Sequence, residues 1–210
     1  MNDCGEIHAL FHKMRRFTFP FDPSLIPTSG IYVLFETGET GHGGDRIVRV
    51  GTHTGERQLR SRLNQHFVKE NKDRSIFRKN IGRAILHRNG DPFLDQWNLD
   101  LTSRLAREIS GGTIDRSRLS ETETLVSKYI RSHFSFVAFE VPSKFERLRL
   151  ESALISTVFL CDECQPSDAW LGRHSPVPKI VHSGLWLVNE LDKTPITVAD
   201  LAALRICCMK

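Results

Sequence analysis

The stretch GIYVLF at residues 30–35 is rich in β-branched and aromatic residues, a composition typical of a mostly buried strand. The stretch RIVRVG at residues 46–51 has a similar character, and the glycine-rich segment TGETGHGG at residues 37–44 separates the two. So many glycines indicate a connection that is too loose for a tight turn. The two stretches therefore predict the arms of a β-hairpin, and the rest of the sequence must show whether this hairpin also carries a functional site.

The composition is that of a globular protein. The chain has 210 residues, of which 40% are hydrophobic, enough to build a core in one domain that carries an insertion. No run approaches the roughly 20 apolar residues of a membrane span, and the N-terminus lacks the apolar core of a secretory signal. We therefore expect a soluble, intracellular protein, cytoplasmic or associated with the nucleoid.

The pattern of the remaining elements predicts an α+β fold, a small mixed or antiparallel β-sheet flanked by helices. We expect a short N-terminal helix followed by an irregular arm, helices at about 56–70, 75–87, 143–160 and 198–207, a strand at 134–141 and a further strand at 184–188. Ser143 and Glu146 form a capping-box pattern at the start of one of these helices. We expect a single domain over residues 1–210, with a core at about 29–168, a helical insertion at about 88–128 and a C-terminal extension at about 169–210.

Positive charge is concentrated in one part of the chain. Residues 56–88 hold ten Lys or Arg and three acidic residues, a local net charge of +7, whereas the whole chain carries +4. Such a concentration is expected of a surface that meets phosphate. A solvated helix face would give the same pattern, so charge alone leaves both interpretations open.

Two of the predicted helices carry polar residues on or near their apolar faces. In the helix at 56–70, the apolar face is formed by Leu59, Leu63 and Phe67. Arg62 and His66 lie one turn apart at the edge of this face. They could line a cleft, or they could simply mark the boundary of the buried face. In the later helix, Glu151 falls inside an apolar arc that includes Phe145 and Leu148. A buried carboxylate is costly unless it is paired or holds a cation. Glu151 is therefore a candidate metal ligand, with a buried Glu–Arg pair as the alternative.

The order of these residues along the chain resembles the GIY-YIG nuclease superfamily. The resemblance rests on GIY at 30–32, RVG at 49–51, Arg62 and His66 on the following helix, and Glu151 on a later one. It covers about residues 30–168, and its most specific part is VGT at 50–52 followed by LRSRLNQHF at 59–67. Two departures are visible: Arg49 replaces the tyrosine that opens the second motif, and the asparagine that often follows the metal-binding helix is absent, with Gln165–Asp168 near its place.

The resemblance implies a metal-dependent DNA endonuclease that leaves 3′-hydroxyl and 5′-phosphate ends. It implies that Glu151 holds Mg²⁺ or Mn²⁺ and that Arg62 donates to the phosphate. Tyr32 would orient or deprotonate the attacking water, with the help of His66. The expected partner is double-stranded or branched DNA, held by basic residues on and around the two helices: Arg49, Arg57, Arg60, Lys72, Arg78, Lys79 and Arg83. The sequence does not predict an oligomeric state.

Two other functions stay open. Because Arg49 replaces a tyrosine, the chain could be a nucleic-acid-binding domain of GIY-YIG type that has lost or weakened catalysis. The pair Cys161 and Cys164, with His174 and His182 downstream, could instead form a zinc site, although the spacing matches no standard pattern. The odd number of cysteines, five, indicates reduced thiols rather than a disulfide framework.

Overall fold

A four-stranded antiparallel sheet forms the centre of the protein, of which the computed structural model describes residues 3–110 and 112–208. Its strands are β1 (Phe17–Thr18), β2 (Gly30–Gly41), β3 (Gly44–Gly51) and β4 (Phe134–Glu140), arranged in the order β1-β4-β2-β3. Helices flank this sheet, so the predicted α+β class is confirmed. The two-residue strand β1 comes from the N-terminal segment that we expected to be irregular.

Nine α-helices surround the sheet within the described residues. The sequence predicted most of their positions to within a few residues, and the capping serine of α7 accepts the amide of Glu146 as the capping-box pattern predicts. The helices are α1 (Asp3–His12), α2 (Leu59–Phe67), α3 (Ile76–Arg88), α4 (Phe93–Asn98), α5 (Arg104–Ser110), α6 (Arg116–His133), α7 (Lys144–Phe159), α8 (Pro178–Ser183) and α9 (Val198–Cys208).

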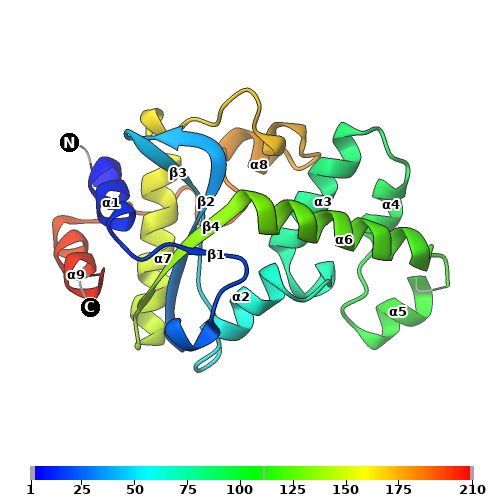
Figure 1. Cartoon of the computed structure of the whole chain (residues 1–210), viewed down its shortest axis with the longest axis horizontal. Coiled ribbons are helices and arrows are strands. Elements are labelled where there is room, and N and C mark those ends of the chain that lie inside the picture. Colours follow the sequence, from blue (N-terminus) through cyan, green and yellow to red (C-terminus); the bar gives the residue numbers. More distant parts are fainter. Residues whose placement is uncertain (1–2, 111, 209–210) are drawn as a thin grey trace.

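Each face of the sheet is buried against its own group of helices. Along β2, Ile31 and Val33 belong to a core shared with α1, α7 and α9, whereas Tyr32 and Leu34 belong to a second core shared with α2, α3 and α6. Figure 1 shows these two groups on opposite sides of the strands. Because side chains alternate along a strand, a strand buried on both faces reads as a continuous apolar run, as residues 30–35 do.

The β2–β3 hairpin is longer and tighter than the sequence predicted. Gly41 pairs with Gly44, so only His42 and Gly43 form the turn, and both adopt positive φ angles, 51° and 77°. Two-residue turns that match the right-handed twist of paired strands require positive φ at both residues. The expectation of a loose connection over residues 37–44 was therefore wrong.

An irregularity in the pairing of β2 with β3 reverses the direction of one functional side chain. Leu34 pairs with Arg49, but the next residue, Phe35, pairs with Ile47, so Val48 is an extra residue on β3. Such a bulge shifts the alternation of side chains by one position. As a result Ile47 packs in the core with α7, while Arg49 points toward Tyr32 on the other face.

The insertion and the C-terminal extension differ in part from the prediction. Helix α6 continues past residue 128 to His133 and leads directly into β4, so the chain has no break at the expected end of the insertion. Residues 184–188 do not form a strand; the amide of Trp186 donates to the carbonyl of Val48, 2.8 Å away, beside the edge strand β3. None of the helices in the described part of the chain combines the length and the apolar character needed to cross a bilayer.

Candidate active site

Tyr32 and His66 form a buried pair between β2 and α2. The Tyr32 hydroxyl lies 2.7 Å from Nε2 of His66, and neither residue is exposed to solvent. His66 Nδ1 lies 2.7 Å from the hydroxyl of Ser75, the residue that caps α3. The amide of Arg78 donates to the same hydroxyl oxygen. This arrangement holds the imidazole ring at both nitrogens and fixes the face that it presents to Tyr32.

The surroundings of His66 keep its ring neutral. Burial lowers the pKa of His66 well below its usual range, and the positive charges of Arg62, Arg49 and Arg78 lower the pKa further. Arg49 donates from Nε to the Tyr32 oxygen at 3.3 Å, so the phenol proton is free to point at His66 Nε2. A neutral imidazole can accept a hydrogen bond from the phenol, so His66 orients the Tyr32 hydroxyl.

Arg49 connects this buried pair to an open cavity. One terminal nitrogen donates to the backbone carbonyl of Trp186, and the side chain also lines a cavity of about 410 Å³ between α3, α7 and residues 187–190. The cavity lies along β3, the edge strand of the sheet. The bulge in β3 and the C-terminal extension therefore place a cation at the boundary between Tyr32 and this cavity.

Glu151, on α7, lines the same cavity. Its Oε1 accepts a hydrogen bond from the amide of Thr52, the first residue after β3, at 2.9 Å. Burial raises the pKa of Glu151, and the charge of Arg49 and the Thr52 amide oppose this effect. The predicted buried Glu–Arg pair is absent from the described contacts of Glu151, so the carboxylate is held by the Thr52 amide and faces the cavity.

The apolar arc that we predicted around Glu151 is partly wrong. Phe145 is 74% exposed and Leu148 is 37% exposed, and Leu148 lines the cavity beside Glu151. The buried face of α7 instead includes Leu150 and Leu154. Glu151 thus lies at the edge of the buried face rather than at its centre, and this position lets its carboxylate reach the cavity.

Arg62 lies in a neighbouring cavity of about 310 Å³, which Thr52 also lines. Its Nη1 donates to the side chain of Gln65 at 3.2 Å and to the carbonyl of Arg74 at 3.1 Å. Through its charge, Arg62 lowers the pKa of both His66 and Glu151. The four residues predicted to be catalytic come from three separate elements and are connected through Arg62, which acts on Glu151 and His66, and through His66, which contacts Tyr32.

The C-terminal extension contributes a second carboxylate that the sequence did not reveal. Glu190 lines the cavity together with Glu151, and its negative charge raises the pKa of Glu151. Glu190 has a positive φ of 64°, and its Oε2 accepts from the Ser152 hydroxyl at 2.7 Å. Asp168, near the expected place of the missing asparagine, is exposed and pairs with Arg173 instead. A motif search confined to residues 30–168 could not have found Glu190.

The two glycines of the motifs allow close approaches that no side chain would permit. A Cβ atom on Gly30 would lie 1.9 Å from the carbonyl oxygen of Phe139 on β4. A Cβ atom on Gly51 would lie 2.3 Å from the hydroxyl oxygen of Tyr32. Gly51 is thus required for the position of the Tyr32 hydroxyl, which gives the second motif a role even though its tyrosine is replaced.

Comparison with known protein families agrees with this geometry. A family model described as GIY-YIG domain matches residues 6–205, nearly the whole chain. The chain belongs to the GIY-YIG domain family. No significant match is found among curated proteins or among solved structures. GIY-YIG domains are in general nucleases that act on DNA with divalent metal ions, so a nuclease-type function follows for this chain at the level of the family.

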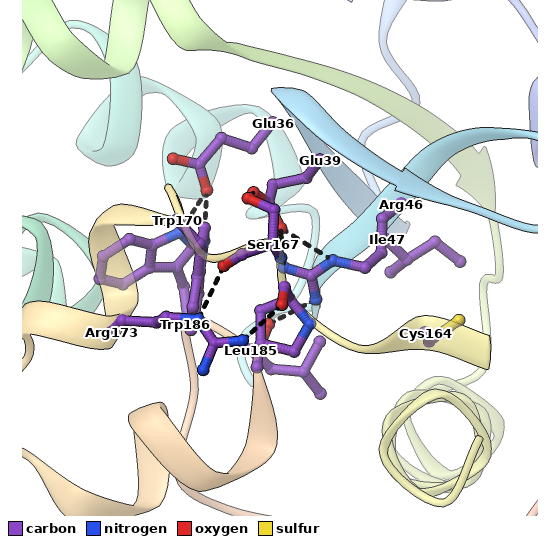
Figure 2. Close-up of polar contacts among 12 residues, drawn as sticks. Glu36, Glu39, Arg46, Ile47, Cys164, Ser167, Trp170, Arg173, Leu185 and Trp186 are labelled. Carbon is purple, nitrogen blue, oxygen red and sulfur yellow. Dashed lines mark hydrogen bonds and ion pairs between the residues drawn. The ribbon is translucent and has the colours of Figure 1, made fainter. Parts of the chain in front are cut away.

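A buried polar network joins the hairpin of this GIY-YIG domain to its C-terminal extension (Figure 2). Glu36, which is 3% exposed, accepts hydrogen bonds from the indole nitrogens of Trp170 and Trp186 at 2.9 and 2.7 Å. It also accepts from the hydroxyl of Tyr129 on α6 at 2.6 Å. Burial raises the pKa of Glu36 despite these donors. Because Trp186 also accepts from Arg49, the network holds the segment that positions the active-site cation.

Two of the residues predicted to bind DNA are buried inside the GIY-YIG domain. Arg78 has no exposed surface, and its guanidinium donates to Glu123 at 2.7 Å and to Ser127 at 2.8 Å, both on α6. Lys72 is 2% exposed and donates to Asp73 and to a backbone carbonyl. The prediction that Arg78 and Lys72 contact DNA does not fit these positions, because their charges are already neutralised within the fold.

The other predicted DNA contacts differ in how freely they can reach a ligand. Arg60 donates to the carbonyls of residues 24 and 26, and Arg83 donates to Asn98 and Asn80, so these side chains brace neighbouring segments. Lys79 is half-buried, and burial lowers its pKa. Arg57, just before α2, is exposed. Of the charge concentrated at residues 56–88, four residues therefore contact the insertion: Lys72, Arg78, Lys79 and Arg83.

Proposed function

We propose that the protein is a divalent-metal-dependent DNA endonuclease that hydrolyses phosphodiester bonds to give 3′-hydroxyl and 5′-phosphate ends. One observation carries the proposal: Arg49 contacts the buried Tyr32–His66 pair and also lines the cavity that holds the Glu151 carboxylate. A tyrosine–histidine pair, a cation and a carboxylate oxygen are therefore grouped around this part of the sheet. These are the chemical groups that phosphodiester hydrolysis requires.

The residues around the cavity fit Mg²⁺ or Mn²⁺. Glu151 would supply a hard oxygen ligand, and Glu190 adds a second carboxylate to the lining of the same cavity. Mg²⁺ keeps several of its waters and needs only one or two carboxylates, and a cavity of about 410 Å³ has room for such a hydrated ion. When bound, the metal would polarise the scissile phosphate and neutralise part of its charge.

The two arginines would hold the phosphate. Among the residues that the structure describes, Arg62 forms hydrogen bonds only through Nη1, and Arg49 forms them through Nε and Nη1. Their remaining N–H groups can donate to phosphate oxygens, on which charge develops in the transition state. In this assignment Arg49 takes over the place of the family's second tyrosine as a donor.

Tyr32 would orient or deprotonate the attacking water, and His66 would assist by its hydrogen bond to the Tyr32 hydroxyl. The buried Tyr32 hydroxyl is in contact with Arg49, which separates it from the cavity. Water therefore reaches the hydroxyl when Arg49 shifts toward a bound phosphate. In this order of events, the attacking water is activated only after the substrate has bound. The hydrogen bonds around Tyr32 would then tighten in the complex with substrate.

A plasmid-cleavage assay with Mg²⁺ or Mn²⁺ tests the proposal. The informative variant is Glu151→Gln, which keeps the shape of the side chain and removes the ligand charge. Its control is Glu146→Gln on the same helix, where the carboxylate is exposed and pairs with Arg149 outside the cavity. We expect cleavage by the wild type and by Glu146→Gln, and a loss of at least about a hundredfold in Glu151→Gln.

Other results would contradict the proposal. Equal cleavage by Glu151→Gln and the wild type would remove the metal role of Glu151. Salt-sensitive DNA binding with no metal-stimulated cleavage by the wild type would instead identify a nucleic-acid-binding domain that has lost catalysis, the alternative that the replacement by Arg49 favours. Arg62→Ala tests the contact between Arg62 and the phosphate. Its control is Arg104→Ala, because Arg104 is an exposed residue of α5 and its loss removes the same positive charge.

A further inference from the structure

A second cluster of ligand-type side chains lies at the turn end of the β2–β3 hairpin. Cys4 and His8 come from α1, His42 from the hairpin turn, and Cys161 and Cys164 from the turn that follows α7. The ligand atoms of Cys4, His8, His42 and Cys164 all lie within 4.8 Å of one another. Active-site residues Tyr32, Gly51 and Thr52 belong to the opposite end of the hairpin, so this cluster is separate from the nuclease site.

We propose that this cluster binds a structural zinc ion through Cys4, His42, Cys161 and Cys164. The inference does not depend on the nuclease proposal, because it rests on other residues. It also differs from the zinc site that the sequence suggested. His174 and His182 are not part of the cluster: the carbonyl of His174 accepts from His87, and the ring of His182 packs on Phe159.

The separations between the ligand atoms match a tetrahedral site. The sulfur atoms of Cys4 and Cys164 lie 3.4 Å apart, and Nε2 of His42 lies 3.3 Å from the sulfur of Cys161. Cys161 lies outside the grouping of Cys4, His8, His42 and Cys164, and its contact with His42 brings its sulfur to the edge of that grouping. Zinc–sulfur bonds of about 2.3 Å and zinc–nitrogen bonds of about 2.0–2.1 Å place tetrahedral ligand atoms roughly 3.5–3.8 Å apart. The two separations, Cys4–Cys164 and His42–Cys161, lie within a few tenths of an ångström of these values.

The surroundings of the two histidines select His42 as the nitrogen ligand. His42 Nδ1 lies 3.4 Å from the carboxylate of Glu163, while its Nε2 faces Cys161. A carboxylate on one ring nitrogen with the other nitrogen facing the metal is the usual arrangement of zinc-binding histidines. Both nitrogens of His8 are already satisfied: Nδ1 lies 2.9 Å from the carbonyl of Cys4, and Nε2 accepts the amide of Ile47 at 3.2 Å.

The spacing and the connectivity of the ligands fit a structural site. Cys161 and Cys164 are three positions apart in a turn closed by a hydrogen bond from the amide of Cys164 to the carbonyl of Cys161 at 3.1 Å. Four protein ligands fill a tetrahedral zinc site and leave no position for a substrate. Zinc bound here would fasten α1, the hairpin turn and the C-terminal side of α7, the helix that carries Glu151.

The first experiment measures zinc in the full-length wild-type protein, purified without a metal-affinity tag under reducing conditions. We expect about one zinc ion per chain, released when a mercurial reagent blocks the thiols. X-ray absorption at the zinc edge should show three sulfur neighbours and one nitrogen neighbour. Folded protein with less than about a tenth of an equivalent of zinc, or a Cys4–Cys164 disulfide in its mass spectrum, would overturn the proposal.

Cobalt binding to the metal-free protein tests the choice of ligands. We expect the visible bands of tetrahedral cobalt together with thiolate charge-transfer bands, both lost in Cys161→Ser and His42→Ala. The matched control is Cys208→Ser, which removes a thiol outside the cluster and should bind cobalt as the wild type does. If Cys161→Ser binds cobalt normally while His8→Asn does not, the proposed ligand set is wrong.

Discussion

Replacing Arg78 tests whether this residue serves the fold or binds DNA. In Arg78→Met, the guanidinium that donates to Glu123, Ser127 and the carbonyl of His66 is lost, and the carboxylate of Glu123 stays almost fully buried. Removing one partner of a buried ion pair costs about 3–5 kcal/mol, because the other charge is left uncompensated. For a chain of this size, a loss of that magnitude corresponds to a fall in melting temperature of roughly 6–20 °C.

The loss of stability should depend on pH with a definite sign. Burial raises the pKa of Glu123, and the charge of Arg78 opposes that shift. Without Arg78 the pKa of Glu123 rises further. Above this raised pKa, Glu123 carries an unpaired buried charge that destabilises the fold. Below it, Glu123 is protonated and the destabilising charge is gone. The difference in unfolding free energy between the wild type and Arg78→Met should therefore be largest at neutral pH and shrink toward acidic pH.

Urea unfolding of three variants measures these effects. Arg57→Met, at an exposed position, should change the unfolding free energy by less than about 0.5 kcal/mol. The double variant Arg78→Met/Glu123→Leu should regain most of the stability, because it buries no unpaired charge. If Arg78→Met unfolds like the wild type and instead weakens DNA binding, Arg78 is a DNA contact, and the structural role assigned to it is wrong.

The active site leads to three further predictions. Tyr32→Phe should lower cleavage by about 10²–10⁴-fold, the range of general acid–base effects, whereas the control Glu146→Gln should still cleave; equal activity in Tyr32→Phe and the wild type would exclude a role for this hydroxyl. Gly51→Ala places a methyl group against the Tyr32 hydroxyl, so it should reduce cleavage and cost about 1–3 kcal/mol of stability in thermal unfolding. Glu190→Gln should raise the Mg²⁺ concentration for half-maximal cleavage about tenfold, as is typical for residues that support a metal ligand, and an unchanged metal titration would show that Glu190 does not act with Glu151.

The sequence determined the elements of this fold and the main residues of its site. Local composition and helical periodicity depend on neighbouring residues only, so residues 30–35, α2, α7 and β4 could be placed from the chain alone. The family could also be inferred from the chain alone, because the order of Tyr32, Arg62, His66 and Glu151 along the sequence does not depend on the tertiary structure.

Other features were decided only by tertiary structure. Whether a basic residue faces solvent or an acidic partner depends on a segment far away in the chain, and Arg78 is neutralised by Glu123, 45 positions later. The bulge that turns Arg49 toward Tyr32 depends on the register between β2 and β3, which side-chain composition does not fix.

The active site and the proposed zinc site depend on distant segments in the same way. Glu190 and the backbone of Trp186 reach the edge of β3 from the C-terminal extension, and Cys4 meets Cys164 across 160 positions of sequence. Such contacts form only when the chain folds on itself, because the residues involved have no local pattern that links them. The sequence by itself indicated which functional residues the hairpin carries, and the tertiary structure determined which distant residues complete the site.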